Sequence, residues 1–207
     1  MELDMTISIA IIILTCIISI TSFNNDRRID DLSMWPYMVK EKNQYYRFIT
    51  SGFVHADFMH LGFNMFTLFF FGSFIEKMFL LVFNGKLYYL LFYVLALILS
   101  DIPTYLKHRN NSGYRTIGAS GAVSAVVFAA ILFQPWAKIL VFFIPMPAIL
   151  YGIVYLGYTI YLSRRGSHDG INHDAHLWGA VFGILFPLIF EPRIGLIFLD
   201  QLMHGYR

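Results

Sequence analysis

Charged residues are scarce in this sequence. Of its 207 residues, 14% are charged, whereas about 25% is usual for soluble domains. The formal net charge of +2 is small and scattered along the chain. The shortage argues against an ordinary soluble domain, and nothing in the charge pattern indicates a nucleic-acid partner.

Cysteine is nearly absent as well. The single thiol, Cys16, lies in an apolar run, so a disulfide within the chain is impossible and the thiol is best read as packing. The seven histidines raise the question of a metal. However, the chain has no H-E-x-x-H motif, no cysteine cluster and few carboxylates at membrane depth. We therefore expect no metal and no other cofactor.

What the sequence has in abundance is long hydrophobic runs. Hydrophobic residues make up 57% of the chain, and its mean hydropathy is +0.61. A helix crosses the hydrocarbon layer in about 20 residues, and the runs are far too long for barrel strands. The sequence predicts an all-α membrane protein, one domain over residues 1–207. Six helices are expected to span the membrane, at residues 5–23, 58–81, 87–106, 116–133, 147–163 and 175–190.

Three segments outside the predicted spans have a distinctive composition. The first loop, residues 24–57, contains Trp35, Tyr37, Tyr45 and Tyr46, which suit a membrane interface. We expect a structured, membrane-associated loop there rather than a floppy linker. The apolar "ILVFFIPMP" before the fifth span contains prolines and cannot be one straight helix. The tail, residues 191–207, alternates apolar and charged residues and is predicted to lie flat on the membrane.

Loop charges bear on orientation. The acidic start, "MELDM", argues against a cleaved signal peptide, so the first run is expected to be a permanent span. With six spans both ends share one side, which carries five cations: Lys77, Lys86, Lys138, Arg193 and Arg207. The other side carries ten: Arg27, Arg28, Lys40, Lys42, Arg47, Lys107, Arg109, Arg115, Arg164 and Arg165. The positive-inside rule then favours termini outside.

Polar residues within spans indicate function by default. The first group lies in "HADFMHLGFN", where His60 and Asn64 are four residues apart. On a helix they share one face, and both can donate hydrogen bonds. The alternative is a polar pair that holds two helices together.

The second group is the "GASG" stretch, Gly118 to Gly121, with Ser120 between the glycines. Serine in a membrane helix often serves close packing, and Ser120 and Ser124 could do no more than that. Ser120, however, stands at a predicted helix N-terminus, where free N–H groups and the helix dipole favour negative charge. A nucleophile at this position would find an oxyanion site beside it.

The third group is "HDAHLWGAVFG", which contains His173 and His176. Gly179 and Gly183 follow His176 on the same helix face and form a small-residue seam. This seam would bring His176 against another helix with small residues, and Ser120, Gly121 and Ser124 are the best candidates. A neutral imidazole beside a serine hydroxyl is the minimum apparatus for nucleophilic catalysis.

Together these three groups resemble the rhomboid family of intramembrane serine proteases, in its bacterial six-span type. The family pattern of H-x-x-x-x-H-x-x-x-N, G-x-S-G and A-H with two following glycines reads here "HADFMHLGFN", "GASG" and "AHLWGAVFG". The resemblance runs from about Tyr45 to Pro187. Each motif is weak alone, but they occur in the family's order and on the corresponding spans.

The resemblance implies a role for each residue of the pattern. Ser120 is the expected nucleophile and His176 the expected general base, with no acidic third member. His60, Asn64, Gly118, Ala119 and the Ser120 N–H would surround the oxyanion or the substrate. The residues expected to support the fold and the site are Arg47, Gly72, Glu76, Gly121, Gly179 and Gly183.

The sequence departs from the family at two places. Many members have Trp-Arg in the first loop, where this chain has Tyr46-Arg47. Some have an aromatic residue one turn after the serine that stacks on the histidine, where this chain has Ser124. What orients His176 is then open. In bacterial relatives the termini face the cytoplasm, and we follow the family over the charge count.

The resemblance implies substrates that are other membrane proteins, cut in or near their transmembrane segments, and a bacterial inner membrane surrounded by lipids. Two alternatives stay open. An inactive rhomboid-like protein that binds membrane clients usually lacks the serine or the histidine, and both are present here. A transporter would predict repeat symmetry and charged pairs in the spans, and the sequence has neither. Substrate identity and oligomeric state cannot be read from the sequence.

Overall fold

The computed structural model describes residues 6–141, 144–165 and 170–205, and its regular structure is mostly helical. In chain order the elements are α1 (Ile7–Ile20), α2 (Asp26–Leu32), α3 (Pro36–Lys42), α4 (Arg47–Thr50), the 3₁₀ turn η1 (Ser51–Phe53), α5 (Phe58–Thr67), the π-helical η2 (Leu68–Gly72), α6 (Ser73–Phe83), α7 (Leu87–His108), α8 (Ser120–Phe133), β1 (Lys138–Val141), β2 (Ile144–Pro147), α9 (Ala148–Arg165), α10 (His173–Phe190) and α11 (Arg193–His204). The predicted span start at residue 5 and the last two tail residues lie outside the described part.

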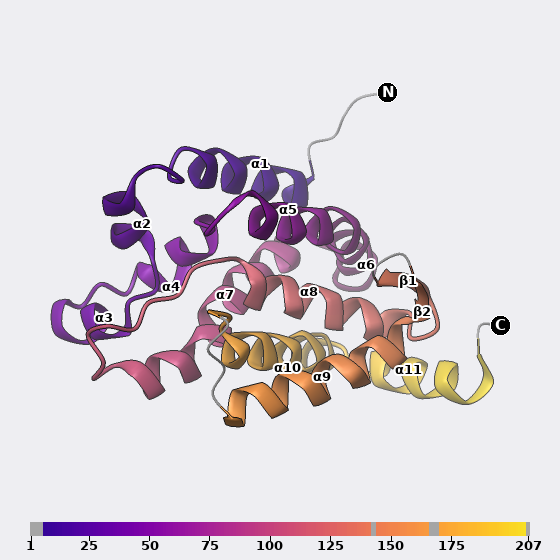
Figure 1. The fold of residues 1–207 in the computed structure, drawn as a ribbon. Coiled ribbons are helices and arrows are strands. Elements are labelled where there is room, and N and C mark those ends of the chain that lie inside the picture. Colours follow the sequence, from indigo (N-terminus) through magenta and orange to yellow (C-terminus); the bar gives the residue numbers. More distant parts are fainter. Residues whose placement is uncertain (1–5, 142–143, 166–169, 206–207) are drawn as a thin grey trace.

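Helix α8 occupies the centre of the bundle (Figure 1). Every residue of α8 after Ser120 is buried, and the helix is apolar on all sides. A helix that is apolar all round belongs in a core. It packs against α7 and α10, with α5 and α9 also in contact. Ser120 is therefore the one residue of this central helix that is not fully enclosed.

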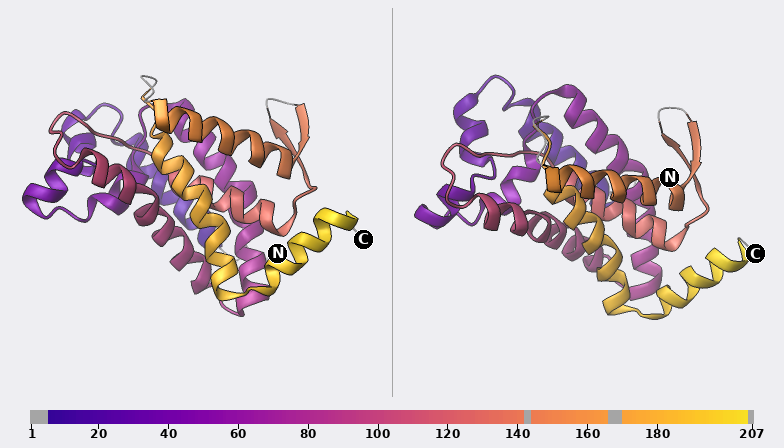
Figure 2. Two further views of the ribbon diagram at one scale, coloured as in Figure 1. Left: turned by 90° about the horizontal axis from the view of Figure 1, so that it is seen from below. Right: turned by 60° about the horizontal axis from the view of Figure 1, so that its bottom comes forward.

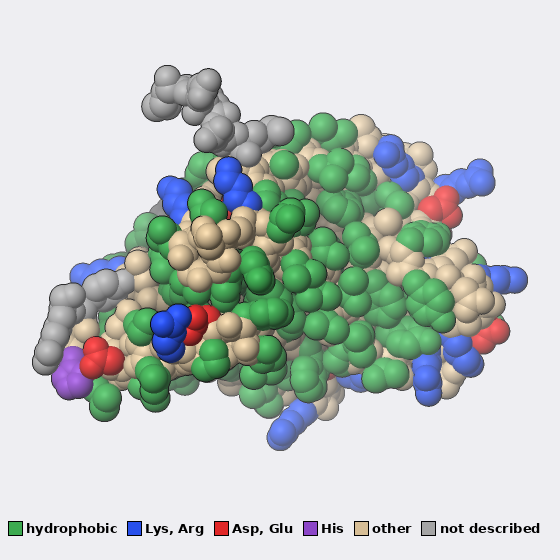
Figure 3. Space-filling model, turned by 180° about the vertical axis from the view of Figure 1, so that it is seen from behind, with side chains coloured by type: hydrophobic (Ala, Val, Ile, Leu, Met, Phe, Trp, Pro, Cys, Tyr) green, Lys and Arg blue, Asp and Glu red, His purple; other side chains and the backbone are tan. Residues whose placement is uncertain are grey.

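The composition of the helices fits an integral membrane protein. Three are long and apolar enough to cross a bilayer: Phe58–Phe83, Leu87–His108 and His173–Phe190. Two shorter apolar helices, Ile7–Ile20 and Ser120–Phe133, accompany them. Apolar side chains cover the middle of the face in Figure 3, and Lys and Arg lie towards its margins. Each of the six predicted spans overlaps one of these helices or α9.

The first loop is folded. It contains α2, α3, α4 and η1, and the buried Arg47 ties it together. The Nη1 of Arg47 donates to the carbonyl oxygens of Asp30 and Ser33, both at 2.7 Å, and its Nε donates to Gln44 at 2.7 Å. The predicted structure in this loop is present, and the contacts of Arg47 fit a supporting role.

Two of the residues predicted to support the fold, Glu76 and Gly72, lie where helices meet closely. The carboxylate of Glu76 in α6 accepts hydrogen bonds from the N–H groups of Ile7 and Ser8, at 2.8 and 2.9 Å, and from the Ser8 hydroxyl at 2.8 Å. It thereby satisfies donors at the start of α1. At Gly72 a Cβ would lie 2.7 Å from the hydroxyl of Tyr89, so glycine permits the close approach of α7.

The proline-containing segment before α9 forms a hairpin. Strands β1 and β2 pair antiparallel, from Lys138 opposite Pro147 to Val141 opposite Ile144. The prediction that this stretch is not a straight helix is confirmed. The tail forms α11, which points away from the bundle beside the hairpin (Figure 2). The indole N–H of Trp136 donates to the carbonyl of Gln201 at 2.8 Å and connects the two.

Candidate active site

Ser120 is the first residue of α8 because the chain before it cannot be helical. Gly118 has a φ of +117°, which residues with a Cβ rarely adopt. A Cβ at Gly118 would also lie 2.7 Å from Cε1 and Nε2 of His60. The predicted span over 116–133 therefore begins four residues too early, and the helix dipole starts at the serine itself.

The backbone N–H groups around Ser120 differ in their availability. The N–H of Gly118 donates to the carbonyl of Ser51 at 2.9 Å, and the N–H of Ala119 donates to Nε2 of His55 at 3.4 Å. Gly118 and Ala119, two of the residues predicted to surround the oxyanion, therefore already donate their N–H groups to other residues of the protein. The N–H of Ser120 belongs to the first turn of α8, whose donors lack intrahelical partners.

Helix α10 meets α8 backbone to backbone through the two predicted glycines. A Cβ at Gly179 would overlap the carbonyl of Gly121, and a Cβ at Gly183 would overlap the carbonyl of Ala125. A Cβ at Gly121 would in turn come within 3.3 Å of the carbonyl of Ala175. The seam lies at Gly121 and Ala125 rather than at Ser124. Because Gly121 contacts both Gly179 and the carbonyl of Ala175, Ser120 and His176 lie on facing helices within about one turn of this contact.

Ser124 faces a different helix. Its hydroxyl is hydrogen-bonded to the hydroxyl of Tyr155 in α9 at 2.6 Å. The ring of Tyr155 lies 6.3 Å from the ring of His176 between centroids, with an interplanar angle of 19°. Sequence reasoning missed Tyr155, because nothing in the local pattern of α9 distinguishes it from the neighbouring tyrosines.

His60 and Asn64 lie on one face of α5, next to the segment that leads into α8. The ring of His60 packs over Gly118, as described above, and edge-on against the ring of His55, with centroids 4.8 Å apart. Asn64 is buried, and its Nδ2 donates to the carbonyl of His60 at 3.0 Å. An asparagine amide has two N–H donors, so the second one is a further donor at this position.

His55, the first residue of the "HADFMHLGFN" stretch, received no functional role from the sequence alone. Its ring is fully buried and contacts the Ser19 hydroxyl through Nδ1 at 3.3 Å, in addition to accepting from Ala119. Burial, followed by the nearby charge of His60, lowers the pKa of His55 to about 3. His55 is therefore a neutral hydrogen-bond acceptor at physiological pH, which suits a role in fixing the loop before Ser120.

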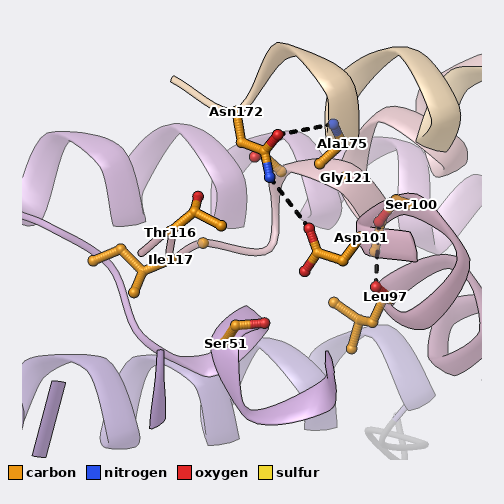
Figure 4. A pocket seen from close by; sticks show the side chains of 12 residues that line it. Ser51, Leu97, Ser100, Asp101, Thr116, Ile117, Gly121, Asn172 and Ala175 are labelled. Carbon is orange, nitrogen blue, oxygen red and sulfur yellow. Dashed lines mark hydrogen bonds between the residues drawn. The ribbon is translucent and has the colours of Figure 1, made fainter. Parts of the chain in front are cut away.

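A small cavity adjoins Ser120 on its α7 side. Its polar lining includes Asp101, Asn172 and Ser51 (Figure 4). Asn172 caps α10 by accepting from the N–H of Ala175 at 3.1 Å, and its Nδ2 donates to Asp101 at 3.3 Å. The sequence signal that could have found Asn172 is an asparagine directly before the first helical residue, His173, since asparagine is favoured at N-caps. Among the described residues no group of three or more His, Cys, Asp or Glu is arranged to hold a metal ion.

Comparison with known proteins decides the family. The model of the rhomboid domain matches residues 42–193, which is more than half of the chain and includes α5, α7, α8, α9 and α10. The chain belongs to the rhomboid family. The resemblance to the rhomboid family inferred from the motifs is confirmed, whereas the bacterial six-span type stays a prediction.

Individual relatives agree. The chain is 36% identical over 143 residues to RHOMBOID-like protein 12, mitochondrial, of Arabidopsis thaliana, a match that covers 64% of this chain and 42% of the relative. It is 30% identical over 156 residues to the putative rhomboid protease YdcA of Bacillus subtilis, covering 70% and 67%. It is 29% identical over 142 residues to the human presenilin-associated rhomboid-like protein, mitochondrial, covering 67% and 36%.

The chain spans only 36 to 54% of the length of the first relatives. Two of the relatives are named as mitochondrial and chloroplastic, and another comes from a bacterium. These names give no support to a bacterial inner membrane over an organellar one. The rhomboid family includes proteases and inactive relatives, so membership alone does not assign an activity to this chain.

Proposed function

We propose that this rhomboid-family protein is an intramembrane serine endopeptidase that cuts membrane-protein substrates with a Ser120–His176 dyad. The observation that carries the proposal is the glycine seam. Because Gly179 leaves no room for a Cβ against Gly121, the backbones of α8 and α10 touch at the level of the serine and the histidine. A serine at a helix start, with a histidine on the helix packed against it, would suit nucleophilic catalysis.

The chemistry follows from the two groups. The Oγ of Ser120 attacks the scissile carbonyl while His176 takes its proton, and the resulting tetrahedral intermediate bears an oxyanion. The N–H of Ser120, with His60 and Asn64, would stabilise that charge, since donors placed for a developing oxyanion stabilise it strongly. His176 then gives the proton to the leaving amine, and water hydrolyses the acyl-enzyme. No cofactor is required.

Substrates are expected to be membrane proteins whose helix can unwind near the cut, because a peptide must be extended to reach Ser120. The surrounding lipid supplies the apolar solvent for the helices of both proteins. The whole chain, residues 1–207, is proposed to act as one domain. Six spans and cytoplasmic termini are proposed with it, and topology mapping with reporter fusions tests both.

The test uses the full chain purified in detergent, a labelled single-span substrate and a fluorophosphonate probe. We expect cleavage by the wild type and none by Ser120→Ala or His176→Ala, each with an unchanged melting temperature. The probe should label the wild type at Ser120. Ser112→Ala is the matched control, because Ser112 is exposed in the segment between α7 and α8 and does not line the cavity beside Ser120. Cleavage that persists in both dyad variants would overturn the assignment. Binding of the substrate without any cleavage or labelling would favour an inactive client-binding protein.

A further inference from the structure

We infer that Tyr155 of α9 is a positioning residue that fixes the imidazole of His176 for catalysis, with Ser124 as its anchor. The inference rests on the proposed function of the Ser120–His176 dyad. It answers the question that the sequence left open, namely what orients the histidine when no aromatic residue follows the serine by one turn on α8.

Two contacts define the arrangement. The Tyr155 hydroxyl and the Ser124 hydroxyl are 2.6 Å apart, a normal distance for a hydrogen bond between hydroxyls. The Tyr155 ring lies nearly parallel to that of His176, at an angle of 19° and a centroid distance of 6.3 Å. This is within the range in which aromatic rings interact favourably. The tyrosine thus bridges α8 and α10 although it belongs to α9.

The anchor explains why the ring stays in place. Tyrosine has two side-chain torsions, and the hydrogen bond at its tip restricts both. Ser124 is buried in the core-facing part of α8, where a buried hydroxyl without a partner would be costly. Each hydroxyl therefore satisfies the other, and the ring of Tyr155 is held in a fixed position on one side of His176. Helix α10, which carries His176, is in turn held against α8 by the glycine seam.

The neighbouring residues of α9 do not make the contacts that Tyr155 makes. Ile153 and Val154 are 63% and 58% exposed, as is usual for side chains that face lipid. The ring of Tyr151 is tilted against that of Tyr155, with centroids 5.5 Å apart. Among the described residues, however, no hydrogen bond of the Tyr151 hydroxyl and no ring contact between Tyr151 and His176 is found. Tyr151 is accordingly a matched control on the same helix.

The experiment compares four variants with the wild type: Tyr155→Phe, Ser124→Ala, the double variant of these two, and Tyr155→Ala. The rate of fluorophosphonate labelling at Ser120 reports activation of the serine without any peptide substrate. Tyr155→Phe and Ser124→Ala should each slow labelling about 3- to 10-fold, the effect of one hydrogen bond. The double variant should be no slower than either single one, since both remove the same bond.

Tyr155→Ala removes the ring and should slow labelling on the order of 10- to 100-fold, as expected for a misplaced catalytic group. With a peptide substrate kcat should fall by a similar factor while KM changes less than about twofold. Tyr151→Phe and Tyr151→Ala should match the wild type. A multiplicative loss in the double variant, or a Tyr155→Ala variant that labels as fast as the wild type, would overturn the inference.

A second readout separates this inference from the proposed function. The side-chain nitrogen resonances of His176, observed by NMR in detergent, do not require turnover. They should shift in Tyr155→Ala and stay unchanged in Tyr151→Ala. If the wild type fails to label but the His176 resonances respond, the protease proposal fails while the contact role of Tyr155 stands. If the resonances do not respond to Tyr155→Ala, the positioning role is refuted whatever the activity.

Discussion

At the scale of single residues, Gly118 is constrained both by its backbone conformation and by its neighbours. Its backbone conformation, with φ at +117°, is strained for any residue with a Cβ, at a cost of about 1–3 kcal/mol. The ring of His60 fills the space that a Cβ would need. One glycine thus determines both where α8 begins and where His60 lies.

Replacing Gly118 by alanine should therefore lower the free energy of unfolding by about 1–3 kcal/mol and strongly reduce Ser120 labelling. Thermal unfolding in detergent and the probe assay measure the two effects. Gly113→Ala is the control, because its Cβ would meet only the Asn111 side chain at 3.5 Å and its φ is not positive. Equal effects of the two substitutions would contradict this explanation.

His55 makes stability depend on pH. Its pKa is near 3 in the folded protein, because of burial and then the charge of His60, and near 6.5 when unfolded. Below pH 6.5 the unfolded chain binds a proton that the folded protein refuses, so stability falls as pH drops from 6.5 towards 3. At pH 5 the loss from this group is about 2 kcal/mol.

Melting temperatures measured between pH 7.5 and pH 5 should accordingly decline, and His55→Gln should decline less steeply because it has no group to protonate. His204→Gln is suited as the control, since His204 lies exposed on α11 beside Asp200. If His55→Gln keeps the full wild-type slope, the buried neutral imidazole is not its source.

At the scale of elements, the contact between α8 and α10 is the feature on which the site depends. Neither Gly179 nor Gly183 can accept a Cβ without moving a backbone carbonyl of α8. Backbone atoms cannot yield as a flexible side chain can, so one helix would have to shift. The distance between the serine and the histidine would grow with that shift.

Gly179→Ala and Gly183→Ala should thus each destabilise the protein by about 1–3 kcal/mol or more and reduce labelling on the order of 100-fold. Gly157→Ala on α9 is the matched control, because its Cβ would have no atom within 4 Å. Labelling and melting are compared for all three. Wild-type rates in both seam variants would show that close helix contact is unnecessary.

At the scale of the whole molecule, the fold encloses a polar site within an apolar exterior. Large apolar side chains on α5, α6, α7, α9 and α10 are exposed, far more than soluble proteins tolerate. The first loop extends from one end of the bundle, whereas the hairpin and α11 lie at the other end (Figure 1). The lipid belt is expected between these ends.

Nitroxide labels can test that belt. In a Cys16→Ser background, labels at Ile153→Cys and Leu91→Cys should be more accessible to oxygen than to a water-soluble nickel chelate, since oxygen partitions into lipid. A label at Lys42→Cys in the first loop should show the reverse preference. Chelate access at Ile153 equal to that at Lys42 would place α9 outside the bilayer.

The sequence by itself determined the features that arise from local or periodic rules. Hydrophobic runs located the helices to within a few residues, because burial in lipid needs an uninterrupted apolar length. The glycines at 179 and 183 predicted a close helix contact, because their spacing places them on one face. The serine between two glycines predicted a helix start, although the helix begins at residue 120 rather than 116.

Only the tertiary structure decided which residues meet across helices. The bond of His55 to Ala119, the bond of Asn172 to Asp101 and the pairing of Tyr155 with Ser124 join residues 31 to 71 positions apart. Such contacts depend on helix rotation, tilt and depth, which no local pattern encodes. The hairpin before α9 was likewise undetermined, since a short apolar run with prolines is compatible with several structures.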